Sequence, residues 1–345
     1  MDNQPKLPSM DNAACSAGGA PATYRVCAFY RFMRLEEIPL LQKLIRSRLI
    51  EAEMCGTVLL APEGINGTVA GPESGTLEFF EWLQSQPGLS SLQVRESWCE
   101  NPPFKRTKVK IKKEIVTLGA EGVDPVGQTG TYVSPDEWDA LIEDPEVLLI
   151  DARNGYEVEV GRFKGAVSPD TATFRDFPDY VKQHLNPEQN PKIAMYCTGG
   201  IRCEKASAYL RQNGFREVFQ LQGGILNYLE TIPGDQSSWE GECFVFDDRT
   251  TVDENLAIGG YDQCHACRRP ISESHKQSDK YTKGVSCPKC YDSKSDRDRL
   301  RYAERERQTH LSDLRGDVHI GPGSQANPAT RIARSYDNSQ EHADE

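Results

Sequence analysis

Apolar positions in the first third of the chain change their period several times, and each period predicts one kind of element. Strand-like apolar runs fall in five segments: residues 24–32, 56–61, 68–71, 92–97 and 108–118. Helical spacing occurs in residues 35–51 and 76–84, and residues 62–67 are expected to form a turn. The order strand–helix–strand–strand–helix–strand predicts a ferredoxin-like (acylphosphatase-like) α/β sandwich for residues 24–120.

A linker rich in Gly, Asp and Pro, residues 119–130, precedes a second alternation of strands and helices. Strands are expected at residues 147–150, 192–196 and 217–221, and helices at 177–184, 203–210 and 225–229. Another helix is expected after Ser134, with Pro135 at its first position and Glu137 completing a capping box. The alternation predicts an open parallel sheet over residues 131–235, with functional groups at the carboxyl ends of its strands.

The turn after strand 192–196 carries the clearest chemistry, because Cys197 stands there between a strand and a helix. The residues that separate Cys197 from Arg202 are Thr198, Gly199, Gly200 and Ile201. Helix N-terminal amides and the Arg202 guanidinium stabilise a thiolate, which makes Cys197 the predicted nucleophile. A C-x4-R loop suits one sulfur atom on the cysteine and favours a rhodanese-type loop over the wider C-x5-R loop of cysteine phosphatases. The alternative is a buried structural cysteine.

Three further groups near this turn each allow two interpretations. Asp151 and Arg153 end strand 147–150, so Arg153 either reaches the mouth of the loop or braces the sheet edge with Asp151. Cys203 either resolves a disulfide or persulfide on Cys197 or is a buried helical thiol. The turn that carries Glu63 and Asn66 either faces the site or is a plain turn.

Composition places these domains in a reduced, soluble setting. The chain has 345 residues, of which 37% are hydrophobic and 27% charged, and no apolar run approaches the ~20 residues of a membrane span. Eleven cysteines without a recognisable export signal indicate free thiols and a metal site rather than a disulfide framework. Residues 1–23 are predicted to be a disordered leader, and residues 296–345 a charged tail that begins as a solvated helix and becomes disordered.

A basic cluster stands out against the net charge of −12, which argues against nonspecific coating of nucleic acid. The cluster contains Lys105, Arg106, Lys108, Lys110, Lys112 and Lys113. The lysines at 108, 110 and 112 alternate with Val109 and Ile111, so one strand face is expected to be cationic and the other buried. This stripe, excluding Lys113, is interpreted as an RNA-binding surface with Phe104 available for stacking, and the alternative is a protected sheet edge.

Two cysteine pairs follow a short strand expected at residues 242–247. They are Cys264 with Cys267, and Cys287 with Cys290. Two C-x2-C pairs separated by residues 268–286 are typical of a structural zinc ribbon in which four thiolates hold the ion. Residues 242–295 are therefore predicted to form a Cys-rich C-terminal module, and the alternative is reduced thiols without metal.

These motifs together resemble the rhodanese-related tRNA uridine hydroxylase family (TrhO). The resemblance rests on residues 61–71, 108–116, 151–154, 196–206, 221–225 and 244–247 and on the four cysteines of the C-terminal module. It spans roughly residues 24 to 292, and it implies a rhodanese domain for residues 131–235.

What this resemblance implies is an O2-dependent cytoplasmic enzyme that hydroxylates the wobble uridine (position 34) of tRNA to 5-hydroxyuridine. Cys197 is the position of the family's key cysteine, and the implied partner is the tRNA anticodon loop. Our hypothesis for the chemistry is thiolate attack of Cys197 on C6 of the uracil, with Arg202 and loop amides holding the charge. O2 is the expected co-substrate, zinc a structural ion, and no organic cofactor, membrane or obligate protein partner is expected.

Two other functions remain open at this stage. The six-residue loop by itself supports a sulfurtransferase that acts through a Cys197 persulfide. A noncatalytic RNA-binding protein with a relic rhodanese domain is the third, and the presence of both Cys197 and Arg202 counts against it.

Overall fold

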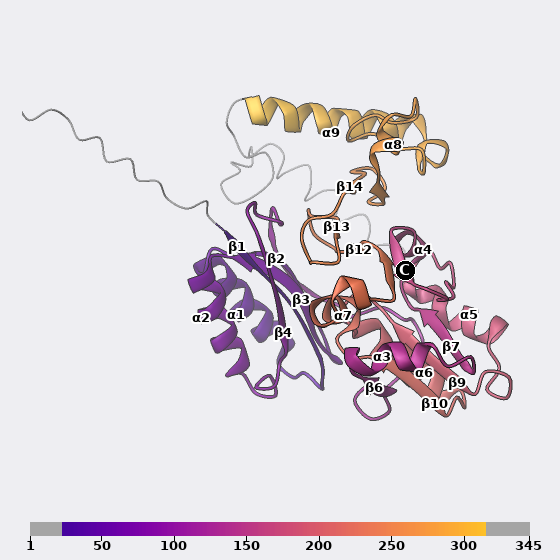
Figure 1. Cartoon of the computed structure of the whole chain (residues 1–345). Coiled ribbons are helices and arrows are strands. Elements are labelled where there is room, and N and C mark those ends of the chain that lie inside the picture. The colour runs from indigo at the N-terminus through magenta and orange to yellow at the C-terminus, as the bar shows by residue number, and fades with distance from the viewer. Residues whose placement is uncertain (1–22, 315–345) are drawn as a thin grey trace, which may run out of the picture.

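The N-terminal part is a five-stranded sheet with two helices on one face, seen in the computed structural model, which describes residues 23–314 (Figure 1). The strands are β1 (Tyr24–Phe32), β2 (Cys55–Ala61), β3 (Gly64–Gly71), β4 (Val94–Cys99) and β5 (Thr107–Ile111). The helices are α1 (Ile38–Glu51) and α2 (Glu73–Gln84). The strand order β4-β1-β3-β2 is ferredoxin-like, which confirms the predicted class, and β5 extends it by pairing parallel to β2.

The pleat of this sheet divides its side chains between a helix-covered face and an open face. Phe29, Val58 and Ile65 pack in the core under α1 and α2. Their neighbours Tyr30 and Leu59 point the opposite way, because successive strand residues alternate sides. This open face is turned toward the second domain (Figure 1).

Two boundaries in this domain differ most from the prediction. β3 begins at Gly64, inside the predicted turn 62–67. A Cβ at Gly64 would lie only 2.0 Å from the Arg31 carbonyl oxygen of β1, so glycine lets β3 pair closely with β1. The predicted strand 108–118 ends at Ile111, where the chain leaves the sheet edge. Ile111 was expected to be buried beside Val109, but it is 44% exposed at this end of the strand.

The second domain is a parallel four-stranded sheet, as predicted, covered on both faces. Its strands are β6 (Thr131–Val133), β7 (Val147–Asp151), β9 (Lys192–Tyr196) and β10 (Glu217–Leu221), in the order β6-β10-β9-β7. Its helices are α3 (Pro135–Ile142), α4 (Gly155–Val158), α5 (Phe177–His184), α6 (Ile201–Gln212) and α7 (Gly224–Thr231). Residues of α5 and α6 share one hydrophobic cluster with the sheet, and residues of α3 and α7 share another.

The predicted start of α3 is confirmed, but the predicted capping-box hydrogen bonds are absent. Ser134 is the N-cap residue and Pro135 follows it, but no side-chain bond to the helix backbone forms. The Ser134 hydroxyl instead donates to the Glu137 carboxylate at 2.8 Å.

Short paired segments and the Cys-rich module complete the described chain. They are β8 (Gly161–Phe163) with β11 (Trp239–Gly241), β12 (Cys243–Phe244) with β13 (Thr251–Val252), and β14 (Asp262–Gln263) with β15 (Pro270–Ile271). The helices here are α8 (Glu273–Lys276) and α9 (Asp296–Leu314). The strand expected at 242–247 is limited to β12, because a turn follows it. A hydrogen bond of 2.9 Å from Val245 N–H to the Thr250 carbonyl closes this turn. The predicted disorder of residues 1–22 and 315–345 lies outside the described residues.

The two α/β domains are joined by a buried cation on α6. The Lys205 side chain is 2% exposed, and its ammonium group donates to both Glu63 oxygens at 2.8 and 2.7 Å, to Glu114, and to the Val116 carbonyl at 3.1 Å. Glu63 stands in the β2–β3 turn, so this turn docks the N-terminal domain rather than forming a free surface loop.

Replacing Lys205 by Met should lower the free energy of unfolding by about 3 kcal/mol, because two carboxylates then lose their buried partner. Urea unfolding followed by circular dichroism measures this change. Lys182→Met is the matched control, since Lys182 is 65% exposed and pairs with Asp179 on the surface, where we expect less than about 1 kcal/mol. Equal effects of the two substitutions would contradict the anchoring role.

Candidate active site and metal centre

Cys197 lies at the carboxyl end of β9, on the predicted strand-to-helix turn. The turn bends back at Gly200, whose φ of 96° belongs to the left-handed region, and the Gly200 N–H donates to the Cys197 sulfur at 3.1 Å. A Cβ at Gly200 would also lie 2.8 Å from the Tyr30 hydroxyl, so the open sheet face presses directly on the loop. Amides at the start of α7 hold the other side, with Ile225 N–H donating to the Cys197 carbonyl at 3.0 Å.

This environment favours the thiolate of Cys197. Burial by itself raises the pKa of the thiol, but the Cys203 S–H donor, the Arg202 charge and the amides of both residues outweigh burial and lower the pKa to about 6. Cys197 is therefore mostly ionised at neutral pH. Cys203 is fully buried, and burial together with the neighbouring Cys197 raises its own pKa, so Cys203 keeps its proton and donates it.

Arg202 does not present a free charge to the loop. Its guanidinium makes two bonds to the Glu157 carboxylate, at 2.6 and 2.8 Å, and a third to the Thr198 hydroxyl at 3.3 Å. Glu157 has no exposed surface, so the ion pair is buried. Sequence reasoning missed Glu157, although its position three residues after Asn154 at the end of β7 is a helix-start pattern that places a carboxylate at this sheet edge.

Asp151 and Arg153 form a second buried ion pair away from the cavity. Arg153 Nη2 lies 2.6 Å from Asp151 Oδ2, and the same group donates to the Gly161 carbonyl at 2.7 Å. The guanidinium lies 5.2 Å from the centre of the Trp239 ring. Neither residue lines the cavity described next, and this placement corresponds to the alternative in which the pair braces the sheet edge.

A cavity of about 1030 Å³ lies between the open face of the N-terminal sheet and the Cys197 loop. Its walls include Cys197, Thr198, Gly199, Ile201 and Arg202, together with Tyr30, Leu59 and Asn66 of the sheet. Gly200 shapes the loop but does not line the cavity. Cys197 has no surface accessible to water, so a substrate reaches the sulfur only when the loop or a neighbouring side chain moves.

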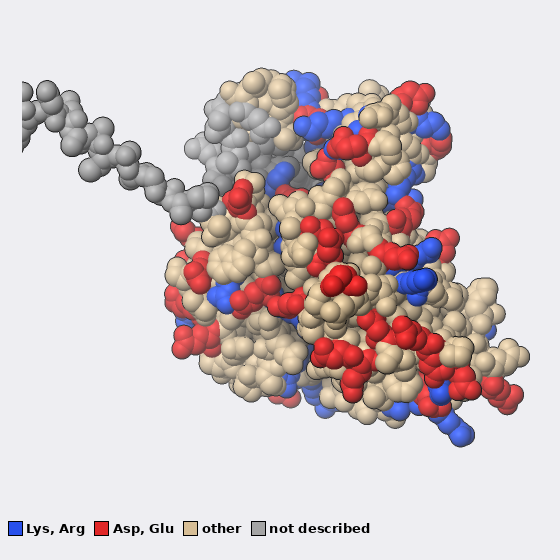
Figure 2. Space-filling model, in the orientation of Figure 1, with Lys and Arg blue, Asp and Glu red and all other residues tan. Residues whose placement is uncertain are grey.

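The cavity is lined by more basic than acidic side chains. The basic ones are Arg31, Arg95, Lys112, Lys113, Arg175, Arg202 and Arg249, and the acidic ones are Glu114, Glu204 and Asp247. This excess contrasts with the net charge of −12 and with the many acidic side chains on the face in Figure 2. The interior of the cleft is thus suited to an anionic ligand in an acidic protein.

Glu204 is a cavity carboxyl that sequence reasoning also missed. The Tyr30 hydroxyl donates to it at 2.6 Å, and the Tyr132 hydroxyl donates as well. Burial raises the pKa of Glu204 despite these two donors, and the charge on Cys197 raises it further. No local pattern marks this residue, because one of its partners comes from the other domain.

The predicted RNA stripe lies on the edge strand β5 and the chain on either side of it. Lys105, Arg106, Lys108, Lys110 and Lys112 are all exposed. Lys108 and Lys110 stand opposite Thr57 and Leu59 in the parallel register, so they share the open sheet face. The cavity is lined by Lys112 of the stripe and by Thr57, Leu59 and Phe104, so the stripe adjoins the cavity.

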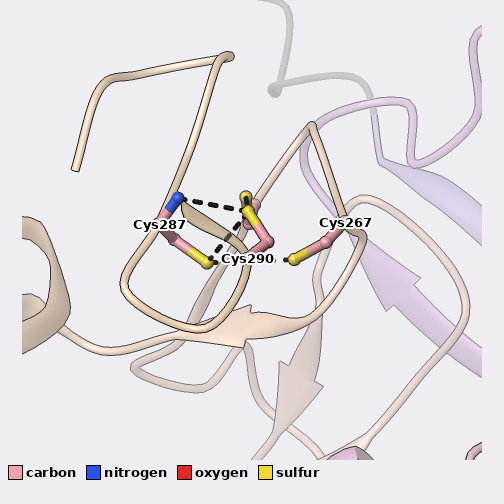
Figure 3. A group of neighbouring side chains, drawn as sticks. Cys267, Cys287 and Cys290 are labelled. Atoms are coloured by element: carbon pink, nitrogen blue, oxygen red, sulfur yellow. Dashed lines mark hydrogen bonds between the residues drawn. The ribbon is translucent and has the colours of Figure 1, made fainter. Parts of the chain in front are cut away.

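The four cysteines of the C-terminal module form one cluster. Figure 3 labels three of them, Cys267, Cys287 and Cys290. The four sulfur atoms all lie within 4.8 Å of one another, with Cys264 and Cys290 at 4.0 Å and Cys267 and Cys287 at 3.8 Å. Four sulfurs bound tetrahedrally to zinc at about 2.3 Å are separated by roughly 3.8 Å, so the cluster fits such an ion. It can hold a metal ion such as zinc in a closed, structural site.

Two known domain families match parts of the chain. Residues 24–115 match the UPF0176 acylphosphatase-like domain, and residues 134–231 match the rhodanese-like domain. Among the residues that the structure describes, no helix has both the length and the apolar character needed to cross a bilayer.

Solved structures resemble parts of the chain. A rhodanese-like domain from Anabaena sp is 21% identical, covers 32% of this chain and 78% of its own length, and has a TM-score of 0.27. A rhodanese-like domain protein from Staphylococcus aureus is 25% identical over 28% of this chain and 90% of its own, with a TM-score of 0.25. A protein of unknown function from Rhodopseudomonas palustris, described as a possible tyrosine phosphatase, is 21% identical over 29% and 80%, with a TM-score of 0.26. At such low TM-scores, function has to be argued from the site itself.

Titration of Cys197 should show half-ionisation near pH 6, because amide donors and the Arg202 charge favour its thiolate. The measurement is the difference in thiolate ultraviolet absorbance between the unmodified protein and Cys197→Ser. Cys203→Ala removes a donor and should move the Cys197 pKa up toward the ordinary value of about 8.5. Cys243→Ala, which alters an equally buried thiol, should leave it in place; an unchanged titration in Cys203→Ala would refute the assigned donor.

Replacing Cys264 and Cys287 by Ala should abolish metal binding, because two of four ligands are lost. Zinc per chain, measured by elemental analysis of the purified protein, is expected to fall to background. Cys55→Ala, at a half-buried thiol on β2, should retain the full content. Full zinc occupancy in the double variant would show that these cysteines are not the ligands.

Proposed function

We propose that this chain, which has the acylphosphatase-like and rhodanese-like architecture of the TrhO family, hydroxylates the wobble uridine of tRNA at C5, using O2 and Cys197. The observation that carries the proposal is the position of Cys197, whose lowered pKa of about 6 makes it a thiolate beside a large basic cavity. A thiolate supplies the nucleophile, and the cavity suits an anionic substrate of nucleotide size.

The first step activates the uracil ring. The Cys197 sulfur adds to C6, the C5–C6 double bond is lost, and its electron pair moves to C5 and the adjacent carbonyl oxygen as an enolate. C5 then bonds to O2 and, after protonation, carries a hydroperoxide. The loop amides stabilise the negative charge of the Cys197 thiolate. They therefore favour its departure from C6 at the end of the cycle.

The remaining steps restore the enzyme. A thiol reductant supplies two electrons that cleave the O–O bond, leaving a hydroxyl on C5 and releasing one water, while two thiols become a disulfide. Removal of the C5 proton then re-forms the C5–C6 double bond and expels the Cys197 thiolate. Glu204 lines the same cavity, and its raised pKa makes it a suitable acceptor for that proton.

tRNA is the proposed partner because of the charge around the site. The exposed side chains of Lys108 and Lys110 share the sheet face that leads into the cavity, and phosphates are attracted to such a strip. A uridine in the anticodon loop is outside a duplex, so extending it into a pocket costs little unstacking energy. With this substrate we propose a cytoplasmic location.

Sulfur transfer through a Cys197 persulfide is the second candidate. It is favoured by the small C-x4-R loop, in which the Gly200 amide donates to the Cys197 sulfur at 3.1 Å. A small sulfur donor such as thiosulfate, however, leaves the wide basic cavity without a role.

The deciding experiment compares wobble nucleosides of tRNA by mass spectrometry in cells with and without this protein. Deletion should remove 5-hydroxyuridine, and the unmodified gene should restore it. Cys197→Ser should restore less than about 1% of it, because the nucleophile is lost, whereas Cys55→Ser should restore it fully. Unchanged 5-hydroxyuridine together with a loss of thionucleosides would instead establish sulfur transfer.

A further inference from the structure

Phe246 is an aromatic ring left open to solvent at the wall of the cavity. It is 61% exposed, whereas Phe244, two residues earlier, is buried at 1%. Phe246 lines the same cavity as Cys197. A single exposed apolar side chain is ordinary on a protein surface, so the informative observation is the place of this ring in the wall of the Cys197 cavity.

The ring is held on a rigid turn. Val245 N–H donates to the Thr250 carbonyl at 2.9 Å, and Arg249 Nη2 lies 2.6 Å from Asp247 Oδ2. The Phe244 ring supports Phe246 edge-on, with 5.2 Å between their centres. A platform that is ordered in advance loses little conformational entropy when a ligand stacks on it.

The same turn is attached to the N-terminal domain. Arg249 Nη1 donates to the Ser97 hydroxyl of β4 at 2.8 Å, and Asp248 N–H donates to the Pro103 carbonyl at 3.1 Å. The turn that carries Phe246 is therefore fixed relative to the N-terminal wall of the cavity and to the chain that leads into the lysine stripe.

Arg202 connects this ring to the reactive loop. Its guanidinium carbon lies 5.8 Å from the centre of the Phe246 ring, while its nitrogen atoms bind Glu157. A cation near one side of the ring helps to orient it. The Phe246 ring thus lies next to the residue that closes the Cys197 loop.

The surroundings indicate the class of ligand. Seven basic and three acidic side chains line the cavity. Glu157 and Asp247 neutralise Arg202 and Arg249, and Arg95 lies 3.4 Å from Glu230, so four of the seven basic side chains are outside the ion pairs of the described residues. An open aromatic ring among cations suits a planar base that carries a phosphate, because the ring stacks on the base and the cations bind the phosphate.

We infer that Phe246 is the stacking platform for the target nucleobase, positioning the ring for attack by Cys197. This inference rests on the proposed function and adds to it the residue that holds the base. It makes Phe246 a positioning residue rather than a source of chemistry.

The test is a thermodynamic cycle on binding, which needs no turnover. An anticodon stem-loop RNA with uridine at the wobble position is compared with the same RNA carrying an abasic site there, using unmodified protein and Phe246→Ala. With unmodified protein, the abasic site should weaken binding about tenfold, and Phe246→Ala should weaken binding of the uridine RNA by a similar factor. In the variant, removing the base should cost almost nothing more.

Additive losses, in which the variant still loses about tenfold on the abasic RNA, would overturn the inference while leaving RNA binding intact. Failure of unmodified protein to bind either RNA would overturn both this inference and the tRNA substrate. Phe246→Leu keeps an apolar side chain without a π-face and should behave like Phe246→Ala. Trp98→Ala is the control, because it removes an aromatic ring that is 47% exposed but does not line the cavity. The Trp98→Ala protein should bind both RNAs like the unmodified protein.

Discussion

One buried ammonium group, that of Lys205, determines how the two α/β domains meet. Lys205 lies on α6, the helix that starts at the Cys197 loop, and its partners Glu63 and Glu114 belong to the turn and the trailing segment of the N-terminal sheet. Because a buried charge strongly favours its full set of partners, this contact sets the open sheet face against the loop. The cavity, and every residue contributed to it from both sides, depends on that placement.

The reactivity of Cys197 results from a balance between burial and hydrogen-bond donors. Burial disfavours a charged sulfur, and amides, the Cys203 thiol and the Arg202 charge favour it more strongly. Arg202 is itself neutralised by Glu157, so nearby donors aimed at the sulfur carry much of the effect. The same arrangement serves a thiolate that attacks carbon and one that carries a sulfur atom, which is why the cavity rather than the loop separates the two candidate functions.

Charge is distributed unevenly over this protein, and the unevenness has a physical use. For the proposed tRNA substrate, the acidic exterior disfavours binding elsewhere on the surface, and the basic cavity beside a lysine-bearing strand favours binding at one place. Phe246 is proposed to add an apolar contact inside that basic region, and its turn is bonded to the N-terminal domain. In these proposals, basic side chains attract the phosphates of the RNA and Phe246 positions the base.

The sequence alone predicted the two sheets, most helices and strands, the Cys197 loop and the four-cysteine cluster, because periodicity and short spacings are properties of neighbouring residues. It overextended the strand at 108–118 and misplaced the contacts of Ser134, since the end of a strand and the partner of a cap depend on what packs nearby. Only the tertiary structure identified Glu157 as the partner of Arg202, 45 residues away, and Tyr30 as the donor to Glu204, 174 residues away. It also chose between the two interpretations of Arg153 and revealed Phe246, because burial and exposure are decided when separate parts of the chain come together.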